Sequence, residues 1–236
     1  MQCSVLFLHS VRVMQATEHF VSACGSSLVP LTDLRAMACR PHPEVDVRAS
    51  CDLPLRCACR NGRLEIIKWL VDGCGADATP QDAAPLFMAC VGGHLQVAQW
   101  LFERHARAGG LAQLALHDLF VQVCTAGEPC VQPVARWLLH HMGSATAIAA
   151  AMHEAVLAAA DGDHWPMVQW LLQQGVVDVH VAGDHLLTGA VRAQQPDLVR
   201  WLLARDPEGR WPAGGWIRML QTWSRPRDAW IRSVVQ

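Results

Sequence analysis

The chain has 236 residues, of which 52% are hydrophobic and 17% are charged, and its formal net charge is −2. This composition is too apolar for a disordered chain, and it lacks the basic excess that binding to a phosphate backbone requires. Neither a secretory signal peptide nor an apolar run of about 18 residues is present, so the ten cysteines are expected to be free thiols. We therefore expect a cytoplasmic protein without a membrane span or a nucleic-acid partner.

Residues 1–44 precede the first clear copy of a repeated segment, and we expect them to form a degenerate unit that caps the chain. A shift by one repeat period places a first helix at residues 11–24 and a second helix at residues 31–39. The end units of a repeat protein face water on one side, so they are expected to depart from the common pattern.

The segment that follows, residues 45–209, contains a pattern that recurs five times. Its marker is the dipeptide Trp-Leu, with spacings of 31, 37, 33 and 31 residues, and in four copies an alanine stands eleven residues before the tryptophan. The tryptophans are Trp69, Trp100, Trp137, Trp170 and Trp201, and the alanines are Ala58, Ala89, Ala159 and Ala190. The third copy carries roughly three extra residues near Cys130. Such a period is typical of stacked structural repeats.

Each copy is predicted to contain a short first helix, a tight turn and a second helix with most of the apolar residues. Small turn-forming residues such as Asn61-Gly62 and Gly92-Gly93 mark the turn. Residues 64, 67, 70 and 71 form an apolar helical stripe in the second helix of the first copy. Prolines near the start of later second helices, at 133, 166 and 196, fit the first helical turn, where a missing N–H costs little. Glycines 73, 75 and 175 are expected to follow second helices.

The first two copies, PLRCACRNGRLEIIKWL and PLFMACVGGHLQVAQWL, resemble the ankyrin repeat, whose pattern begins T-P-L-H-x-A and continues through Gly-His-Leu to an apolar helix end. Gly75-Ala76-Asp77 is similar to the family's hairpin opening. The family's threonine is replaced by Leu53 and Ala84, and its histidine by Arg56 and Phe87. The pattern is most similar to the divergent arrays of large DNA viruses and protists.

This resemblance implies an all-α fold, an ankyrin-repeat solenoid of helix-turn-helix units with short hairpin-like loops. About five clear repeats are expected, with degenerate N- and C-terminal capping units. Their expected bounds are 45–77, 78–110, 111–145, 146–177 and 178–209.

Residues 210–236 are predicted to form the degenerate C-terminal cap repeat. Trp230 follows Trp201 by 29 residues, and Pro226 stands four residues before Trp230, as Pro166 stands before Trp170.

The tryptophan series has two interpretations. It could form an aromatic cage or a stacking platform for a cation or for bases. Each tryptophan instead lies next to a leucine at the same apolar helix-end position, so we predict that the series packs in the core.

The cysteines and histidines also have two interpretations. Cysteines at 51, 57, 59 and 74 could suggest a zinc site, but Cys59, Cys90 and Cys124 share one repeat position and no C-x-x-C pair occurs. We expect small apolar side chains there and no metal. No H-E-x-x-H, G-x-S-x-G or glycine-rich nucleotide loop is present, and His94 matches the family's turn histidine. We therefore expect no cofactor and no enzymatic activity.

The resemblance implies that a partner binds the concave surface formed by first-helix ends and hairpin tips. Carried over position by position, the first-helix candidates are Arg60, Asn61, Val91, Thr125, Asp161 and Arg192. The candidates on the hairpin side are Ser50, Asp52, Gln81, His117, His153 and Asp184. This mixture of charged, hydroxyl and apolar groups suits a protein surface. We predict a monomeric, non-enzymatic scaffold with an unidentified protein partner.

An alternative function is that of a substrate-recruiting adaptor of a ubiquitin ligase. Residues 31–40, LTDLRAMACR, faintly resemble the later helix of an F-box, although the family's opening Leu-Pro and closing tryptophan are missing. This alternative predicts that the N-terminal segment binds a ligase subunit.

Overall fold

The computed structural model describes residues 2–38, 49–80, 83–109, 116–126, 129–180, 185–193 and 195–205. That part of the chain contains twelve α-helices, one short 3-10 turn and no strand, which confirms the predicted all-α fold of helix pairs. The predicted C-terminal repeat at 210–236 lies outside the described residues. The chain divides into two compact units, residues 1–115 and residues 116–236.

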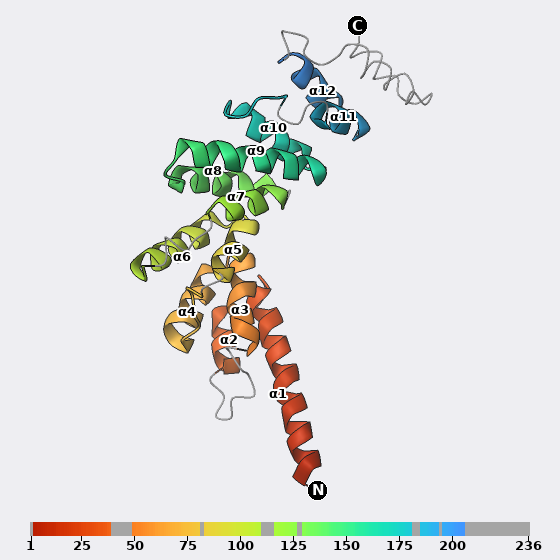
Figure 1. The fold of residues 1–236 in the computed structure, drawn as a ribbon. Coiled ribbons are helices and arrows are strands. Elements are labelled where there is room, and N and C mark those ends of the chain that lie inside the picture. Colours follow the sequence, from red (N-terminus) through yellow and green to blue (C-terminus); the bar gives the residue numbers. More distant parts are fainter. Residues whose placement is uncertain are drawn as a thin grey trace, which may run out of the picture. The chain divides into compact units, whose positions relative to one another are not determined.

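Unit 1 contains three helix pairs. They are α1 (Gln2–Gly25) with α2 (Leu31–Ala38), α3 (Ala49–Arg60) with α4 (Leu64–Cys74), and α5 (Ala84–Val91) with α6 (Leu95–Arg107). Each second helix packs on its own first helix, and α3 packs between α1 and α5 (Figure 1). The first helices therefore form one row, and the second helices are each attached to it.

Unit 2 repeats this arrangement. Its pairs are α7 (Leu116–Thr125) with α8 (Gln132–His141), α9 (Ala145–Asp161) with α10 (Trp165–Gln173), and α11 (His185–Arg192) with α12 (Pro196–Leu203). The first helix α9 contacts both α7 and α11. A 3-10 turn, η2 (Pro129–Val131), precedes α8 and accommodates the extra residues expected near Cys130. Proline stands at the first or second position of α8, α10 and α12, as predicted.

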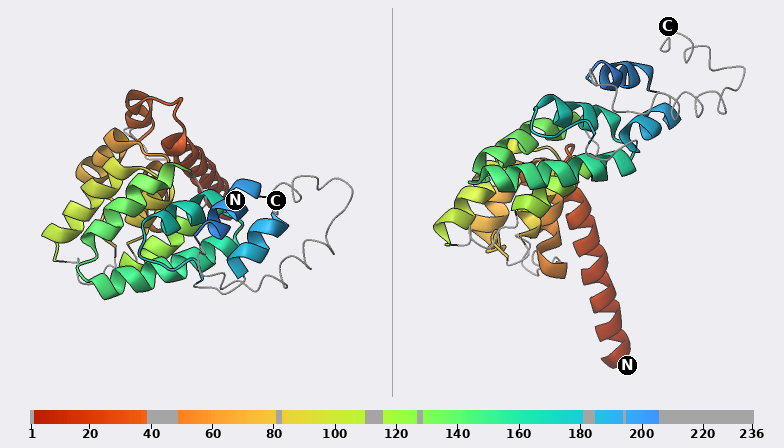
Figure 2. Two further views of the ribbon diagram at one scale, coloured as in Figure 1. Left: turned by 90° about the horizontal axis from the view of Figure 1, so that it is seen from above. Right: turned by 45° about the horizontal axis from the view of Figure 1, so that its top comes forward.

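The structure corrects the length of two first helices. Helix α1 begins at Gln2 rather than near residue 11, and its N-terminal half extends past α2 and α3 (Figures 1 and 2). Helix α9 begins at Ala145, eleven residues before Val156, the expected start of a short first helix. The added segment is rich in alanine, the strongest helix former, and it contains no proline or glycine that would end a helix.

The turn between first and second helix has the same hydrogen bond in four pairs. The backbone N–H that precedes the second helix donates to the carbonyl of the residue five positions earlier, at 2.9 to 3.0 Å. The donors are Arg63, His94, His164 and Gln195, and the acceptors are Ala58, Ala89, Ala159 and Ala190. Bonds of this span close a helix through a left-handed residue, and Gly62, Gly93 and Asp163 have φ values of 70°, 75° and 59°.

The recurring alanine thus has a structural explanation. Ala58, Ala89, Ala159 and Ala190 are fully buried, and each accepts the hydrogen bond that closes its own turn. A methyl side chain allows the close approach of the second helix at this point, whereas a larger side chain would overpack it.

The residue before the second helix also connects neighbouring pairs. The Nε2 atom of His94 lies 2.9 Å from the carbonyl oxygen of Arg60, at the end of the preceding first helix. Arg63 holds the equivalent position one pair earlier, and its guanidinium donates to the carbonyls of Ser26 and Val29, which follow α1. Arg63 and His94 therefore both contact backbone carbonyls of the preceding helix pair. In this way Arg63 attaches the α1–α2 pair to the rest of unit 1.

The tryptophan series is less buried than predicted. Only Trp170 is buried; Trp69, Trp100, Trp137 and Trp201 are half-exposed. Two of these rings are covered by an arginine one turn later: the guanidinium of Arg104 lies 4.5 Å from the ring centroid of Trp100, and that of Arg205 lies 4.0 Å from that of Trp201. The interpretation as core packing therefore holds for Trp170, and the other four rings cover the outer edge of the core.

The cysteines at the shared repeat position are buried, as predicted. Cys59, Cys90 and Cys124 have no exposed surface. Burial raises the pKa of each of these thiols to about 12, and it does the same to Cys24. A thiol that stays protonated at neutral pH is a poor nucleophile.

Alkylation should therefore separate the cysteines in a defined order. We expect iodoacetamide at neutral pH to modify the exposed Cys130 in the native protein and to leave the four buried thiols intact until the chain is unfolded. Peptide mass mapping after a short and a long exposure measures this. Modification of Cys90 as fast as that of Cys130 would contradict the buried position of the thiol.

Candidate functional site

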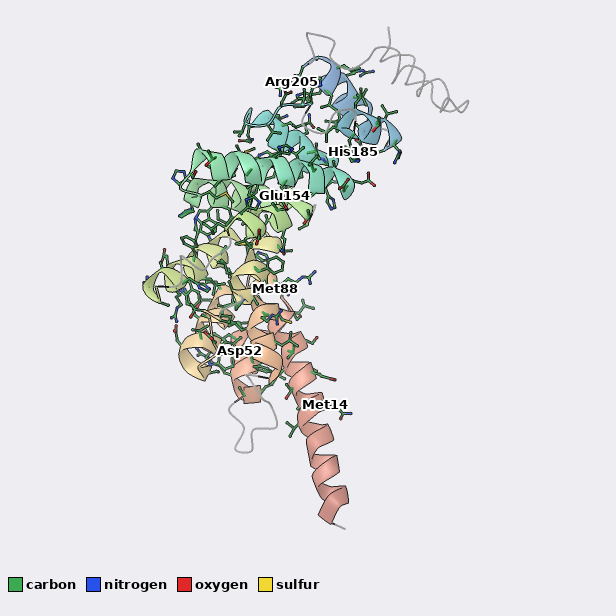
Figure 3. The ribbon with its side chains drawn as sticks, viewed as in Figure 1. Met14, Asp52, Met88, Glu154, His185 and Arg205 are labelled. Atoms are coloured by element: carbon green, nitrogen blue, oxygen red, sulfur yellow. The ribbon has the colours of Figure 1, made fainter. Side chains whose placement is uncertain are left out.

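The first helices of unit 1 present a surface of mixed chemistry. Arg56 and Arg60 lie one turn apart on α3, and the same repeat positions on the adjacent α5 hold Phe87 and Val91. Arg60 is exposed, whereas Arg56, Phe87 and Val91 are half-buried. Met88 is half-buried beside them on α5 (Figure 3). We call these five residues the first-helix face of unit 1.

Two residues predicted for the binding surface in unit 1, Asn61 and Asp52, have structural contacts. The Nδ2 atom of Asn61 donates to the carbonyl of Cys57 at 2.8 Å and so caps the end of α3. Asp52 has a φ of 56°, and its Oδ2 accepts the backbone N–H of Asp77 at 3.3 Å. Asp52 therefore connects the start of α3 to the hairpin that follows α4.

Two further predicted residues of unit 1 cannot be assigned a contact. Gln81 lies outside the described residues, and Ser50 is in α3 but its side chain is outside them. Of the candidates predicted in this unit, Arg60 and Val91 are thus the ones placed on the first-helix face.

In unit 2, two contacts between a histidine and a carboxylate connect neighbouring first helices. The Nε2 atom of His117 on α7 lies 2.7 Å from Oε2 of Glu154 on α9, and Oδ1 of Asp161 on α9 lies 3.5 Å from Nε2 of His185 on α11. Glu154 and His185 are labelled in Figure 3. Sequence reasoning did not select these two residues, because nothing in the local sequence shows which side chains face each other across helices. We call these four residues, together with His153, the first-helix face of unit 2.

The placement of His117 and His153 on the hairpin side was wrong. The structure places His117 at the start of α7. It places His153 in the middle of α9, because α9 begins earlier than expected. His153 remains exposed. Thr125 donates its hydroxyl to the carbonyl of Gln122 at 2.8 Å, and Arg192 is exposed at the end of α11. Asp184 lies outside the described residues.

A shallow groove of about 550 Å³ lies elsewhere in unit 1, between the hairpin after α4 and the last turn of α6. Its two arginines already have partners: Arg104 pairs with Asp72 at 2.5 Å, and Arg107 pairs with Glu103 at 3.3 Å. The groove therefore offers no uncompensated positive charge to a ligand.

His105, in the last turn of α6, is the buried titratable group near this hairpin. Its side chain is 4% exposed, and its Nε2 has no hydrogen-bond partner among the described residues. Burial lowers the pKa of the imidazole below its ordinary value of 6.5, and the nearby Asp77 carboxylate opposes this shift in part. The folded protein therefore binds the proton less readily than the unfolded chain does.

This difference predicts a loss of stability in acid. As the pH falls below 6.5, protonation of His105 should favour unfolding, and the loss should continue until the pH passes the lowered pKa of the folded state. Chemical denaturation at several values between about pH 5 and 7.5 measures it. We expect His105→Leu to flatten this part of the stability curve and His140→Gln, at an exposed position, to leave it unchanged. A wild-type slope that persists in His105→Leu would contradict this assignment.

Neither a metal site nor a membrane-spanning helix is found among the described residues. There, no group of three or more His, Cys, Asp or Glu side chains could hold a metal ion. None of the helices described is long and apolar enough to cross a membrane.

Comparison with known proteins identifies the repeated segment. Residues 33–109 match the family model of ankyrin repeats in three copies, which runs from α2 to α6 in unit 1. No curated protein and no solved structure matches the chain. The turn hydrogen bond of α3–α4 and α5–α6 recurs in α9–α10 and α11–α12, beyond the matched segment. Residues 33–109 are therefore identified as ankyrin repeats.

Proposed function

We propose that this protein is a non-enzymatic scaffold that binds another protein through the first-helix faces of its two units. Ankyrin repeats are generally protein–protein interaction modules. The observation that carries the proposal is the row of adjacent first helices in each unit, which presents charged and apolar side chains together. Arginine, methionine and aromatic residues are enriched at protein interfaces, and Arg60, Met88 and Phe87 lie on one such face.

Site-specific photo-cross-linking in cells would test this proposal. A photoreactive phenylalanine analogue at position 60, 91 or 153 should link the protein to a discrete partner. The same analogue at Gln96 or Gln99, which are exposed on the second helix α6, provides the control and should not. Cross-links that arise from the α6 positions and not from the first-helix positions would refute the proposed surface.

We further propose that the protein is monomeric and cytoplasmic. Light scattering of the purified protein should give a mass near the 25.9 kDa of one chain, and a stable dimer would contradict the monomer. Fluorescence microscopy of the tagged chain tests the location.

The ligase-adaptor function remains an alternative prediction for the N-terminal segment. In the structure α2 packs on α1, Leu34 is fully buried, and Arg63 holds the loop between α1 and α2 through backbone carbonyls. The segment is thus part of unit 1, and the family match begins within it, at residue 33. A binding assay between the whole chain and a ligase adaptor subunit tests this function, and no binding would exclude it.

A further inference from the structure

We propose that the first-helix face of unit 1 recognises an acidic segment of the partner, in which apolar side chains stand between the carboxylates. This inference rests on the proposed function, because it assumes that a protein binds this surface. It adds the chemistry that the partner must present.

The surface of α3 carries positive charge that has no counter-charge among the described residues. Neither Arg56 nor Arg60 forms an ion pair with any carboxylate among the described residues, although the side chains lie one turn apart on α3. By contrast, four cations of the second helices have a carboxylate within 3.6 Å. They are Lys68, Arg104, Arg107 and Arg200. The surface of α3 therefore has two positive charges for which the described residues supply no counter-charge.

Arg56 also has a buried hydrogen-bond donor. The Nε atom of Arg56 is buried and has no hydrogen-bond acceptor among the described residues. A buried N–H without an acceptor costs free energy, about 1–3 kcal/mol in general. The carboxylate on the same helix, Asp52, accepts the backbone N–H of Asp77. An incoming carboxylate could bind the guanidinium of Arg56 in a bidentate arrangement and so supply the missing acceptor.

An apolar surface lies beside the two arginines. Helix α5 packs against α3, and it presents Phe87, Met88 and Val91 at the positions that match Arg56, Cys57 and Arg60 in the previous repeat. All three side chains are half-buried, so part of their apolar surface is still in contact with water. An apolar side chain of the partner that covers this surface would remove it from water, which favours binding. Methionine adapts its shape to different apolar partners.

These features together select one class of occupant. A basic segment would be repelled by both arginines, and a purely apolar segment would leave Arg56 without an acceptor. An acidic segment with interspersed leucine or phenylalanine places carboxylates on α3 and apolar side chains on α5. Complementary charge of this kind mainly sets specificity and association rate.

Fluorescence anisotropy with the full chain tests the inference. The probe is a short fluorescein-labelled peptide of glutamate, leucine and phenylalanine. Two control peptides replace either every glutamate by lysine or every apolar residue by serine. We expect binding of the first peptide only, with an affinity that falls as salt is added.

Variants of the chain locate the binding. Arg56→Gln with Arg60→Gln should weaken binding of the acidic peptide about tenfold or more, since two charged contacts are lost. The matched control is Arg136→Gln, at an exposed arginine of α8, which should not change it. Thermal unfolding of each variant shows whether the fold is retained. Should Arg56→Gln with Arg60→Gln unfold the protein, Arg60→Glu alone, at the exposed position, must still weaken binding.

The outcomes separate this inference from the function on which it rests. Equal binding of the lysine peptide, no binding of the acidic peptide, or no effect of the α3 variants would overturn the acidic specificity. Cross-links from positions 60 and 91 in the same protein would then still support a protein partner at this surface. Cross-links from α6 alone would refute both.

Discussion

Replacing Gly92 by alanine is expected to destabilise unit 1 by about 1–3 kcal/mol. The backbone of Gly92 has φ −73°, which any residue adopts, so strain in φ is not the reason. A Cβ atom at this position would lie 2.3 Å from the carbonyl oxygen of Arg60 and 2.9 Å from the ring of His94. The ring of His94 contacts that same carbonyl, so neither neighbour can move without breaking the contact between two repeats.

Urea denaturation of Gly92→Ala measures this effect, and two other glycines provide controls. Gly143 has nothing within 4 Å of its Cβ position, so Gly143→Ala should change the stability by less than about 0.5 kcal/mol. Gly75 is equally open but has φ +71°, so Gly75→Ala should cost about 1–2 kcal/mol through backbone strain alone. If Gly92→Ala proves as stable as Gly143→Ala, the close contact between repeats does not exist.

The pair Trp165 and Gly189 should show the largest coupling between two residues of unit 2. Trp165 is 5% exposed, and a Cβ at Gly189 would lie 2.6 Å from the tip of its ring. The equivalent positions in unit 1 hold Leu64 and Met88, a pair of intermediate size. In unit 2 the tryptophan is larger, and glycine provides the space for it.

Each single exchange should therefore be costly. Trp165→Leu should lose about 2–4 kcal/mol through the cavity that it leaves, and Gly189→Met should lose about 1–3 kcal/mol through overpacking. The double variant restores the sizes found in unit 1, so it should be more stable than the sum of the two losses predicts. A double-mutant cycle by urea denaturation measures this coupling, and strictly additive losses would show that the two residues are not in contact.

The sequence predicted the helix pairs because their determinants are local and recur. The buried alanine, the turn residues and the proline at the helix start each act within about ten residues, so a single chain shows them in register. The closing hydrogen bond that ends at Ala58, Ala89, Ala159 and Ala190 gives that alanine its physical role.

The candidate site was harder to predict because it depends on contacts between repeats. His117 and Glu154 are 37 residues apart, and their pairing depends on how α7 lies on α9. The early start of α9 also moved His153 from a hairpin into a helix. The outward position of Trp100 and Trp201 could have been predicted from the local sequence. Arg104 and Arg205 each stand one turn after one of these tryptophans and cover its ring.

Amide hydrogen exchange tests most directly the claim that one turn recurs in both units. The backbone amides of Arg63, His94, His164 and Gln195 precede second helices, and without the recurring bond they would exchange as fast as the amide of Gly143, in a loop. We predict that all four exchange slowly, at rates close to those of the helical amides around them. Fast exchange at His164 and Gln195, with protection confined to Arg63 and His94, would show that the repeat ends with unit 1.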